Sequence, residues 1–450
     1  MRDLTQGKEW KTILLFGIPI LIGNLFQLFY NVADSIVVGR WLGTANLAAV
    51  GFGFLIGFVL SAVSFGLSLG NGICISRYCG AHRPEKIRPA MNTGCVFLFW
   101  LGTVATVAGW RYADQLAHGF DVPPEAFGFA VTYLRILFLG CIPVFLSNAL
   151  TNMLRGGGDS TGPVCILIGG VLLNVALDLA SVIYTNMGIA GIAFATVFSQ
   201  FFVCLGTILY LYCRYPEFCP RFPFTEFRLD VWKESLTLGV PSMLHQLSIC
   251  LGFLLLQKLI NGFGSDCAAA FAAASKIDSF VQFPTVNLAF ALSNFLAQNL
   301  AAGKFDRVRR GSAVVFRLGI LMAGAVSVVV LLVPEPLMRC FSADPEVLKI
   351  GCRYFYIVAG FYVVNGVMQI FNGILLGYGK ALQLMICTMF SLCILQVPGA
   401  WLLAGTLLGA TGIWAATPVG WIGGVWIRWR FCRKLAPGIF RFEGGHSTSK

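Results

Sequence analysis

The stretch from Gly17 to Gly43 constrains the fold more than any other part of this sequence. It reads GIPILIGNLFQLFYNVADSIVVGRWLG, and a helix of this length, rising about 1.5 Å per residue, crosses the hydrocarbon core of a bilayer. Near its far end stands one carboxylate, Asp34. A charged group inside a membrane is costly unless it has a partner or a function. The stretch therefore predicts a membrane-spanning helix with a candidate functional acid.

The composition extends this prediction to the whole chain. Of 450 residues, 57% are hydrophobic and only 12% are charged, and the mean hydropathy is +0.78, which excludes an ordinary soluble globular protein. The apolar stretches are continuous rather than alternating, which argues against a membrane β-barrel. The 51 glycines and 39 phenylalanines fit closely packed helices in lipid. We therefore predict an all-α polytopic membrane protein.

Charged and turn-rich breaks divide the sequence into twelve predicted spans. With the N-terminus in the cytoplasm, 23 of the 32 Lys and Arg residues fall in cytoplasmic segments, as the positive-inside rule requires. We therefore expect a multi-pass protein of the cell membrane with both termini cytoplasmic. The spans cover residues 12–37, 45–75, 90–110, 127–153, 162–184, 189–213, 235–260, 267–300, 311–333, 350–376, 381–403 and 409–431. The basic residues on the outer side are Arg40, Arg111, Lys258, Arg339, Lys349 and Arg353.

Several classes of partner and cofactor are not expected from this pattern. The net charge of +12 is spread over short loops, which does not resemble a nucleic-acid-binding face. The 15 cysteines lie mostly inside apolar segments and lack zinc-ligand spacing, and there are only four histidines. The basic N-terminal segment is followed by an apolar run without a small-residue cleavage site, so we expect this run to be retained as a helix. We therefore expect no cofactor and no nucleic-acid partner.

The chain contains an internal duplication with an offset of 221 residues, which is the spacing between Gly43 and Gly264. The same offset aligns the basic loop that starts at His82 with the one that starts at Gly303. It also aligns GIAGIAFAT with GATGIWAAT near the ends of the two halves. Offsets held over nearly half the chain do not arise from apolar composition alone. The sequence therefore predicts a duplicated six-helix unit.

The duplication defines the predicted domains. Six spans per half is an even number, so both halves enter and leave the membrane on the same side and form a parallel repeat. We predict an N-lobe at 1–213, a cytoplasmic linker at 214–234, a C-lobe at 235–435 and a cytoplasmic tail at 436–450. Two lobes facing each other across a cleft are typical of alternating-access transporters.

Acidic residues within the spans are few: Asp34, Asp178 and Asp278. Asn174 precedes Asp178 by one helical turn, so the two share a helix face, and Thr196 offers a hydroxyl at similar depth. Carboxylate, amide and hydroxyl oxygens suit a hard cation or a shared proton, since two close carboxylates do not both ionise cheaply.

Less specific explanations exist for each of these residues. Asp34 could form a solvated pair with Arg40, and Asp178 could be a structural hydrogen bonder; together, beside Asn174, they favour a functional site. Pro19 either kinks the first helix or merely starts it, and Pro241 stands near the equivalent place in the second half. Lys276 and Asp278 do not share a helix face, and we expect each to reach a pore or an interface.

Several motifs resemble the multidrug and toxic compound extrusion (MATE) family. They are NVADSIVVGRWLG, SKIDSFVQFP followed by QNLAAGKFDR, and LRGGGDS followed by NVALD, together with the paired basic loops. The resemblance covers residues 10 to 435 and implies a V-shaped transporter of twelve transmembrane helices in two lobes. Such transporters export organic, usually cationic and amphipathic, compounds in exchange for protons or sodium.

The resemblance also assigns roles to individual residues. Asp34 resembles the first-helix acid of the family's N-lobe cation site, and Asn174, Asp178 and Thr196 resemble its partners, with Asn152 as a further neighbour. These oxygens would serve Na⁺ or a proton. Pro19 is similar to the proline about which the first helix is proposed to bend. One branch of the family also carries acids on helices seven and ten, where this chain offers only His245, Gln246 and Asn365, so we expect ion coupling in the N-lobe.

The sequence thus predicts a secondary active efflux transporter rather than an enzyme, acting as a monomer on small amphipathic molecules in contact with membrane lipid. The coupling ion, a proton or sodium, stays open. The alternative is a flippase for a lipid-linked precursor, which would need several arginines in the cleft, whereas the spans hold mainly Arg135 and Arg317. An isoprenoid transferase would need clustered aspartates for magnesium, which are absent from the sequence. A passive channel does not explain the duplication.

Overall fold

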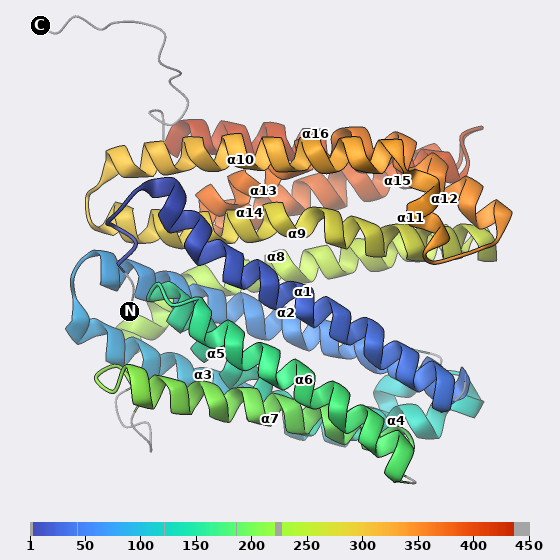
Figure 1. Cartoon of the computed structure of the whole chain (residues 1–450), viewed down its shortest axis with the longest axis horizontal. Coiled ribbons are helices and arrows are strands. Elements are labelled where there is room, and N and C mark those ends of the chain that lie inside the picture. The colour runs from blue at the N-terminus through green and yellow to red at the C-terminus, as the bar shows by residue number, and fades with distance from the viewer. Residues whose placement is uncertain (1–2, 43, 121, 186, 221–226, 436–450) are drawn as a thin grey trace, which may run out of the picture. The chain divides into compact units, whose positions relative to one another are not determined.

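The described residues of the first half of the chain form seven helices, whose arrangement Figure 1 shows. The structure, a computed structural model, describes residues 3–42, 44–120, 122–185, 187–220 and 227–435, so that Gly43, Arg221 and the predicted tail at 436–450 lie outside it. The described residues contain no strand, which confirms the predicted all-α fold class. The helices are α1 (Glu9–Trp41), α2 (Thr44–Gly80), α3 (Pro84–Gly119), α4 (Pro124–Leu139), α5 (Cys141–Gly156), α6 (Thr161–Tyr184) and α7 (Ile189–Arg214).

The second half repeats this order of helices. The offset of 221 residues carries the bounds of α2 onto α9, those of α5 onto α13 and those of α7 onto α16. The helix bounds therefore show the same duplication as the sequence. The helices are α8 (Leu229–Asn261), α9 (Ser265–Ala301), α10 (Phe305–Leu332), α11 (Pro334–Arg339), α12 (Pro345–Val358), α13 (Tyr362–Gly377), α14 (Ala381–Met389), α15 (Val397–Ala404) and α16 (Ala410–Leu435).

Helix breaks are duplicated as well. In the first half α4 and α5 meet at Gly140 with a bend of 45°, and in the second half a 3₁₀ turn, Ala359–Phe361, separates α12 from α13 at the equivalent place. Tyr112 interrupts α3 with non-helical angles, and its counterpart Val333 separates α10 from α11. The breaks therefore belong to the repeated unit. A π-helical turn, Phe390–Gln396, joins α14 to α15 and has no counterpart in α6.

The predicted spans agree with the helices. Among the described residues ten helices are long and apolar enough to cross a membrane, and eleven if the bent pair α4–α5 is one span. Each of the twelve predicted segments coincides with helical structure, with α16 in the last position. The chain is a multi-pass membrane protein, while the number twelve stays a prediction.

The chain packs as two compact units whose limits fall inside helices. One unit comprises Met1–Asp3 and Ile18–Leu247, and the other comprises Leu4–Gly17 and Ser248–Lys450. The division therefore cuts α1 after Gly17 and α8 after Leu247. The lobe boundaries that we predicted follow the duplication rather than the packing, and they stay a prediction.

The start of α1 is fastened to the second unit. The Leu4 amide donates to Gln298 Oε1 at 2.9 Å, and the Arg307 guanidinium donates to the Gly7 carbonyl at 2.6 Å. Arg310 adds an ion pair to Glu9 at 2.9 Å. Several of these bonds use backbone groups ahead of the first turn of α1, which would otherwise have no partner within the helix. Residues 4–17 therefore pack as part of the second unit, with bonds to α9 and α10.

The start of α8 is fastened to the first unit in a similar way. Glu234 accepts a hydrogen bond from the Tyr78 hydroxyl at 2.6 Å and lies 3.7 Å from Arg77. Glycines bring α2 and α8 together, because a Cβ on Gly70 would lie 2.5 Å from the Gly239 nitrogen. Such backbone contact is possible only where side chains are missing.

Close packing also positions the helices of the first unit that carry the candidate site. A Cβ on Gly23 of α1 would lie 3.1 Å from Val164 of α6, and one on Gly170 of α6 would lie 2.2 Å from Val203 of α7. These small residues let α1, α6 and α7 approach closely. A buried apolar cluster from α1, α2, α4 and α7 packs beyond the site and contains Val37, Val38, Ala49, Val50, Ala130, Tyr133, Ile136, Ile189, Ile192 and Ala193.

Candidate functional site

Asp34 lies in α1 and is buried, with 9% of its surface exposed. Its Oδ1 atom has no hydrogen-bond partner among the described residues. This burial argues against the solvated surface pair with Arg40, whose side chain lies outside the description. A carboxylate in this position has lost water without gaining a protein donor on that oxygen. Asp34 is therefore available to a proton or a bound cation.

Asn174 and Asp178 stand one turn apart on α6 and are more deeply buried, with exposed fractions of 3% and 1%. Both side-chain oxygens of Asp178, and both the nitrogen and the oxygen of Asn174, have no hydrogen-bond partner among the described residues. Each such group costs about 1–3 kcal/mol when it is left unpaired. Four unpaired atoms on one helix face are the arrangement expected where an ion, a proton or ordered water completes the site.

Asp34 of α1 and Asp178 of α6 are both buried carboxylates of the first unit. Contact between α1 and α6 at Gly23 and Val164 holds the two helices in this arrangement. Neither carboxylate forms an ion pair with a Lys or Arg whose side chain the structure describes. Two neighbouring buried acids without a basic partner repel each other when both are charged. Among the described side chains no Lys or Arg balances their charge, which leaves a proton or a bound cation to do so.

Asn152 and Thr196 are the more peripheral predicted members. Asn152 on α5 is buried, and its Nδ2 donates to the Asn148 carbonyl at 3.0 Å, while its Oδ1 has no partner within the described part of the chain. The Thr196 hydroxyl on α7 donates to the Ile192 carbonyl at 3.1 Å, which leaves its oxygen free to accept. No hydrogen bond joins either residue to the two carboxylates among the described residues. Their membership in the site stays a prediction.

Pro19 lies well inside α1, ten residues after its first residue, and so is not a helix-start proline. A proline there removes one backbone hydrogen bond and crowds the preceding turn. It also stands directly beyond Gly17, where α1 passes from one packing unit to the other. Pro241 has a corresponding place inside α8, a few residues before that helix changes unit at Leu247. Each of these two helices is therefore weakened near the residue at which it passes from one packing unit to the other.

Asp278 differs from the prediction that it reaches a pore or an interface. It is buried in the second unit, and its two oxygens accept hydrogen bonds from the hydroxyls of Tyr354 and Tyr362. Tyr354 packs edge-on against Trp414, with ring centres 5.2 Å apart. This carboxylate has the protein donors that Asp34 and Asp178 lack. Lys276, in contrast, is exposed, with its ammonium 5.9 Å from the Phe341 ring centre.

The polar residues expected in place of C-lobe acids do not form a comparable group. His245 and Gln246 belong to the first packing unit, whereas Asn365 is buried in the second. Within the described part of the chain, no three His, Cys, Asp or Glu residues lie close enough to hold a metal ion. The buried acid pair in the first unit is therefore the strongest candidate site.

Known proteins similar to this chain were found by sequence and by fold. The profile of the MatE family matches residues 19–180 and 241–402, one segment in each half. A protein of Bacillus subtilis (strain 168), named "Probable multidrug resistance protein YoeA", is 30% identical over 92% of either chain. The "Probable multidrug resistance protein NorM" of Thermotoga maritima is 25% identical over 90% of this chain and 88% of its own. A solved structure described as the outward-facing conformation of a multidrug resistance MATE family transporter has a TM-score of 0.90, 23% identity and 98% coverage of both chains.

Proposed function

Because this chain belongs to the MatE family of membrane transporters, we propose that it exports small organic compounds, often cationic, in exchange for protons or sodium ions. Membership confirms the resemblance that was inferred from its motifs. The observation that carries the proposal is the buried pair Asp34 and Asp178, whose carboxylates have unpaired oxygens and no basic partner among the described residues. Binding of a cation there is what an ion-driven exporter needs.

The proposed mechanism couples this site to the shape of α1. A proton or sodium ion on the acid pair removes the repulsion between the carboxylates and changes how closely α1 can approach α6. Pro19 weakens α1 near its crossing between units, so this is where the helix bends most easily. Exchange follows when the ion is bound better in one facing state and the exported compound in the other.

Measurement of ion-driven flux would assign the coupling ion. The available oxygens come from Asp34, Asn152, Asn174, Asp178 and Thr196, and such a set serves either a proton or Na⁺. Efflux of a fluorescent organic cation is measured from proteoliposomes with a proton gradient or a sodium gradient imposed separately. Transport under the proton gradient alone assigns protons, and transport under the sodium gradient at clamped pH assigns sodium. Loss of efflux under both gradients contradicts the antiport proposal and returns the lipid-precursor flippase as the alternative.

The substrate class rests on the relatives, several of which are named multidrug resistance or multidrug export proteins. We infer small amphipathic compounds, recognised by apolar and aromatic side chains, for which aromatic faces attract a positive charge. The chain would act as a monomer in contact with membrane lipid and without a cofactor. Its family is one of transporters, and the flippase alternative is not favoured, since several matched relatives are named for multidrug resistance or export and one is named a FAD transporter.

The proposed topology places both termini in the cytoplasm, and two exposed cysteines test it. Cys340 follows α11 in a segment predicted outside, whereas Cys213 lies in the last turn of α7, at the predicted cytoplasmic end of the span 189–213. A membrane-impermeant maleimide is expected to label a variant that keeps only Cys340 in intact cells. A variant that keeps only Cys213 is expected to be labelled only after the membrane is permeabilised. The opposite order of labelling inverts the topology.

A further inference from the structure

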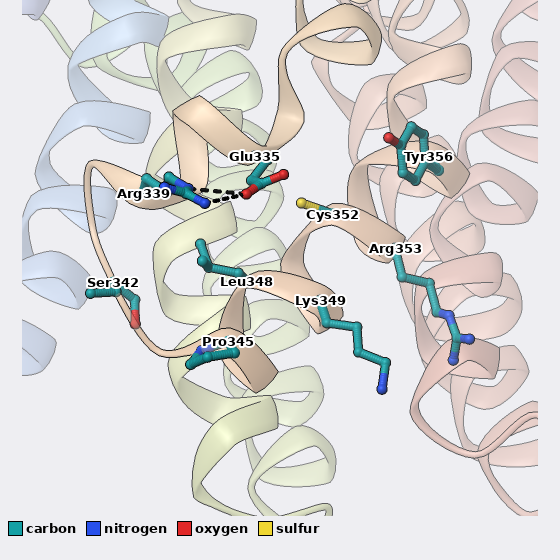
Figure 2. A pocket seen from close by; sticks show the side chains of 10 residues that line it. Glu335, Arg339, Ser342, Pro345, Leu348, Lys349, Cys352, Arg353 and Tyr356 are labelled. Carbon is teal, nitrogen blue, oxygen red and sulfur yellow. Dashed lines mark hydrogen bonds and ion pairs between the residues drawn. The ribbon is translucent and has the colours of Figure 1, made fainter.

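A basic depression at the far end of the second unit is not explained by transport through the buried acid pair. It has a cavity volume of about 880 Å³ and lies between α11 and the first turns of α12 (Figure 2). Its lining contains three basic residues, Arg339, Lys349 and Arg353. These are three of the six basic residues that the positive-inside analysis left on the outer side. The positive-inside rule predicts few basic residues on the outer side, so three of them gathered in one place call for a specific explanation.

The acids of this region are already engaged within the protein. Glu335 accepts from Arg339 at 2.6 Å, and Asp344 caps α12 by accepting from the Glu346 and Val347 amides. Glu346 lies 3.6 Å from the Lys349 ammonium, an exposed and weak ion pair. Figure 2 shows Lys349 and Arg353 extending from the same side of α12, one turn apart. Arg353 makes no ion pair or hydrogen bond within the described ranges, so its charge is unbalanced.

Comparison with the first half shows that these cations are not part of the repeated scaffold. Glu335 corresponds to Asp114, which pairs at 2.6 Å with Arg135 of α4. In the second half the acid is paired by Arg339 of its own helix instead, and Tyr356 stands where the first half has Arg135. Lys349 and Arg353 replace Gly128 and Thr132. The second half therefore carries two exposed cations here, of which Lys349 has only the weak pair with Glu346 and Arg353 has no ion pair among the described residues.

The position of the depression indicates the ligand. It lies just beyond the end of α10, whose last residue Leu332 is exposed, as is the aromatic ring of Tyr356. Exposed apolar residues followed by tyrosine mark the headgroup level of a membrane. A guanidinium binds phosphate oxygens in a forked geometry, and a neighbouring ammonium adds a point charge.

We propose that Lys349 and Arg353 bind a phosphate group at this depression, supplied by the headgroup of an anionic phospholipid at the outer surface of the membrane. Tyr356 would donate its hydroxyl at the same level, while Leu348 and Pro345 line the depression with apolar surface. The site uses residues of the second unit only, and its binding of phosphate does not depend on the coupling ion.

The experiment measures how lipid stabilises the full-length protein in detergent, as the shift of the apparent Tm with added lipid. Phosphatidylglycerol is expected to raise the Tm and phosphatidylcholine is not. The double variant Lys349→Gln with Arg353→Gln is expected to need about 30-fold more phosphatidylglycerol for the same shift, since each basic residue near an anionic surface contributes about 1 kcal/mol. Arg111→Gln, at another exposed base on the predicted outer side, is the matched control and is expected to need at most about 5-fold more lipid, the nonspecific share of one surface charge.

A separate arm distinguishes the source of the phosphate. Inorganic phosphate is titrated at constant ionic strength against the same variants. A Tm shift that depends on Lys349 and Arg353 with phosphate but not with lipid keeps the phosphate site and assigns it to a soluble anion. An unchanged response of the double variant to both ligands overturns the proposal. The charge-preserving exchange Lys349→Arg with Arg353→Lys must keep the lipid response, or the effect is not one of charge.

Discussion

Asp34→Asn is expected to abolish gradient-driven export while the protein stays folded and inserted in the membrane. The amide has the shape of the carboxylate but cannot take up a proton or carry the charge that attracts a cation. Because Asp34 Oδ1 has no hydrogen-bond partner within the described ranges, its replacement breaks no hydrogen bond of that atom there. Efflux of the fluorescent cation from proteoliposomes should fall to the level of protein-free vesicles, with an apparent Tm within a few degrees of the parent.

The matched comparison is Asp278→Asn. Both residues are buried acids, but Asp278 accepts hydrogen bonds from Tyr354 and Tyr362. Its substitution weakens a satisfied network, and each affected bond is worth about 1–3 kcal/mol, so a lower Tm is expected. Asp34→Asn should therefore lose transport and keep its stability, whereas Asp278→Asn should lose stability. Full export by the Asp34 variant, or a collapse of its Tm, contradicts the functional assignment of Asp34.

Gly70→Ala is the substitution with the largest expected effect on stability. The new Cβ would lie 2.5 Å from the Gly239 nitrogen and from the Ser235 carbonyl oxygen, and 2.7 Å from Gly239 Cα. These are backbone atoms of α8, which cannot turn aside as a flexible side chain could. Relief requires α2 and α8 to move apart, at a cost of about 1–3 kcal/mol or more. The apparent Tm of the purified protein should fall by several degrees, with a lower yield of monodisperse protein.

Gly51→Ala on the same helix is the control. No atom lies within 4 Å of a Cβ placed there, and the position is exposed. Alanine is favoured over glycine in a helix by about 0.5–1 kcal/mol, so this variant should keep or slightly raise the Tm. Equal behaviour of the two variants would mean that α2 and α8 do not pack through Gly70 and Gly239.

Much of the fold could be predicted because its determinants are local or repeated. Continuous apolar runs indicate the helices, and the 221-residue offset predicts a duplicated unit, which the bounds of α2 and α9 share. Asn174 and Asp178 could be grouped because one helical turn separates them. The break at Gly140 was not predicted, since the apolar run continues across it and only packing reveals where the helix bends.

Contacts between distant residues limited the prediction of the site. The placing of Asp34 relative to Asp178 depends on how α1 packs on α6, for which the contact of Gly23 with Val164 is evidence and which no spacing in the sequence encodes. The error at Asp278 has the same origin: Tyr354 and Tyr362, on either side of a helix break, reach it across 76 and 84 residues of sequence. An acid seen alone in an apolar run looks equally costly in both cases, and only its partners separate a structural carboxylate from a functional one.

The crossing of α1 and α8 between packing units makes the two halves of the chain resemble partners in a domain swap. Residues 4–17 belong to the first half but pack in the second unit, and residues 229–247 belong to the second half but pack in the first. Each half therefore lends the other a segment that completes its core. Cleavage of the covalent connection between α7 and α8 would leave these exchanged arms in place. The two halves are therefore expected to depend on each other for folding. The six-helix repeat alone would suggest two independent domains, but neither half is expected to be one.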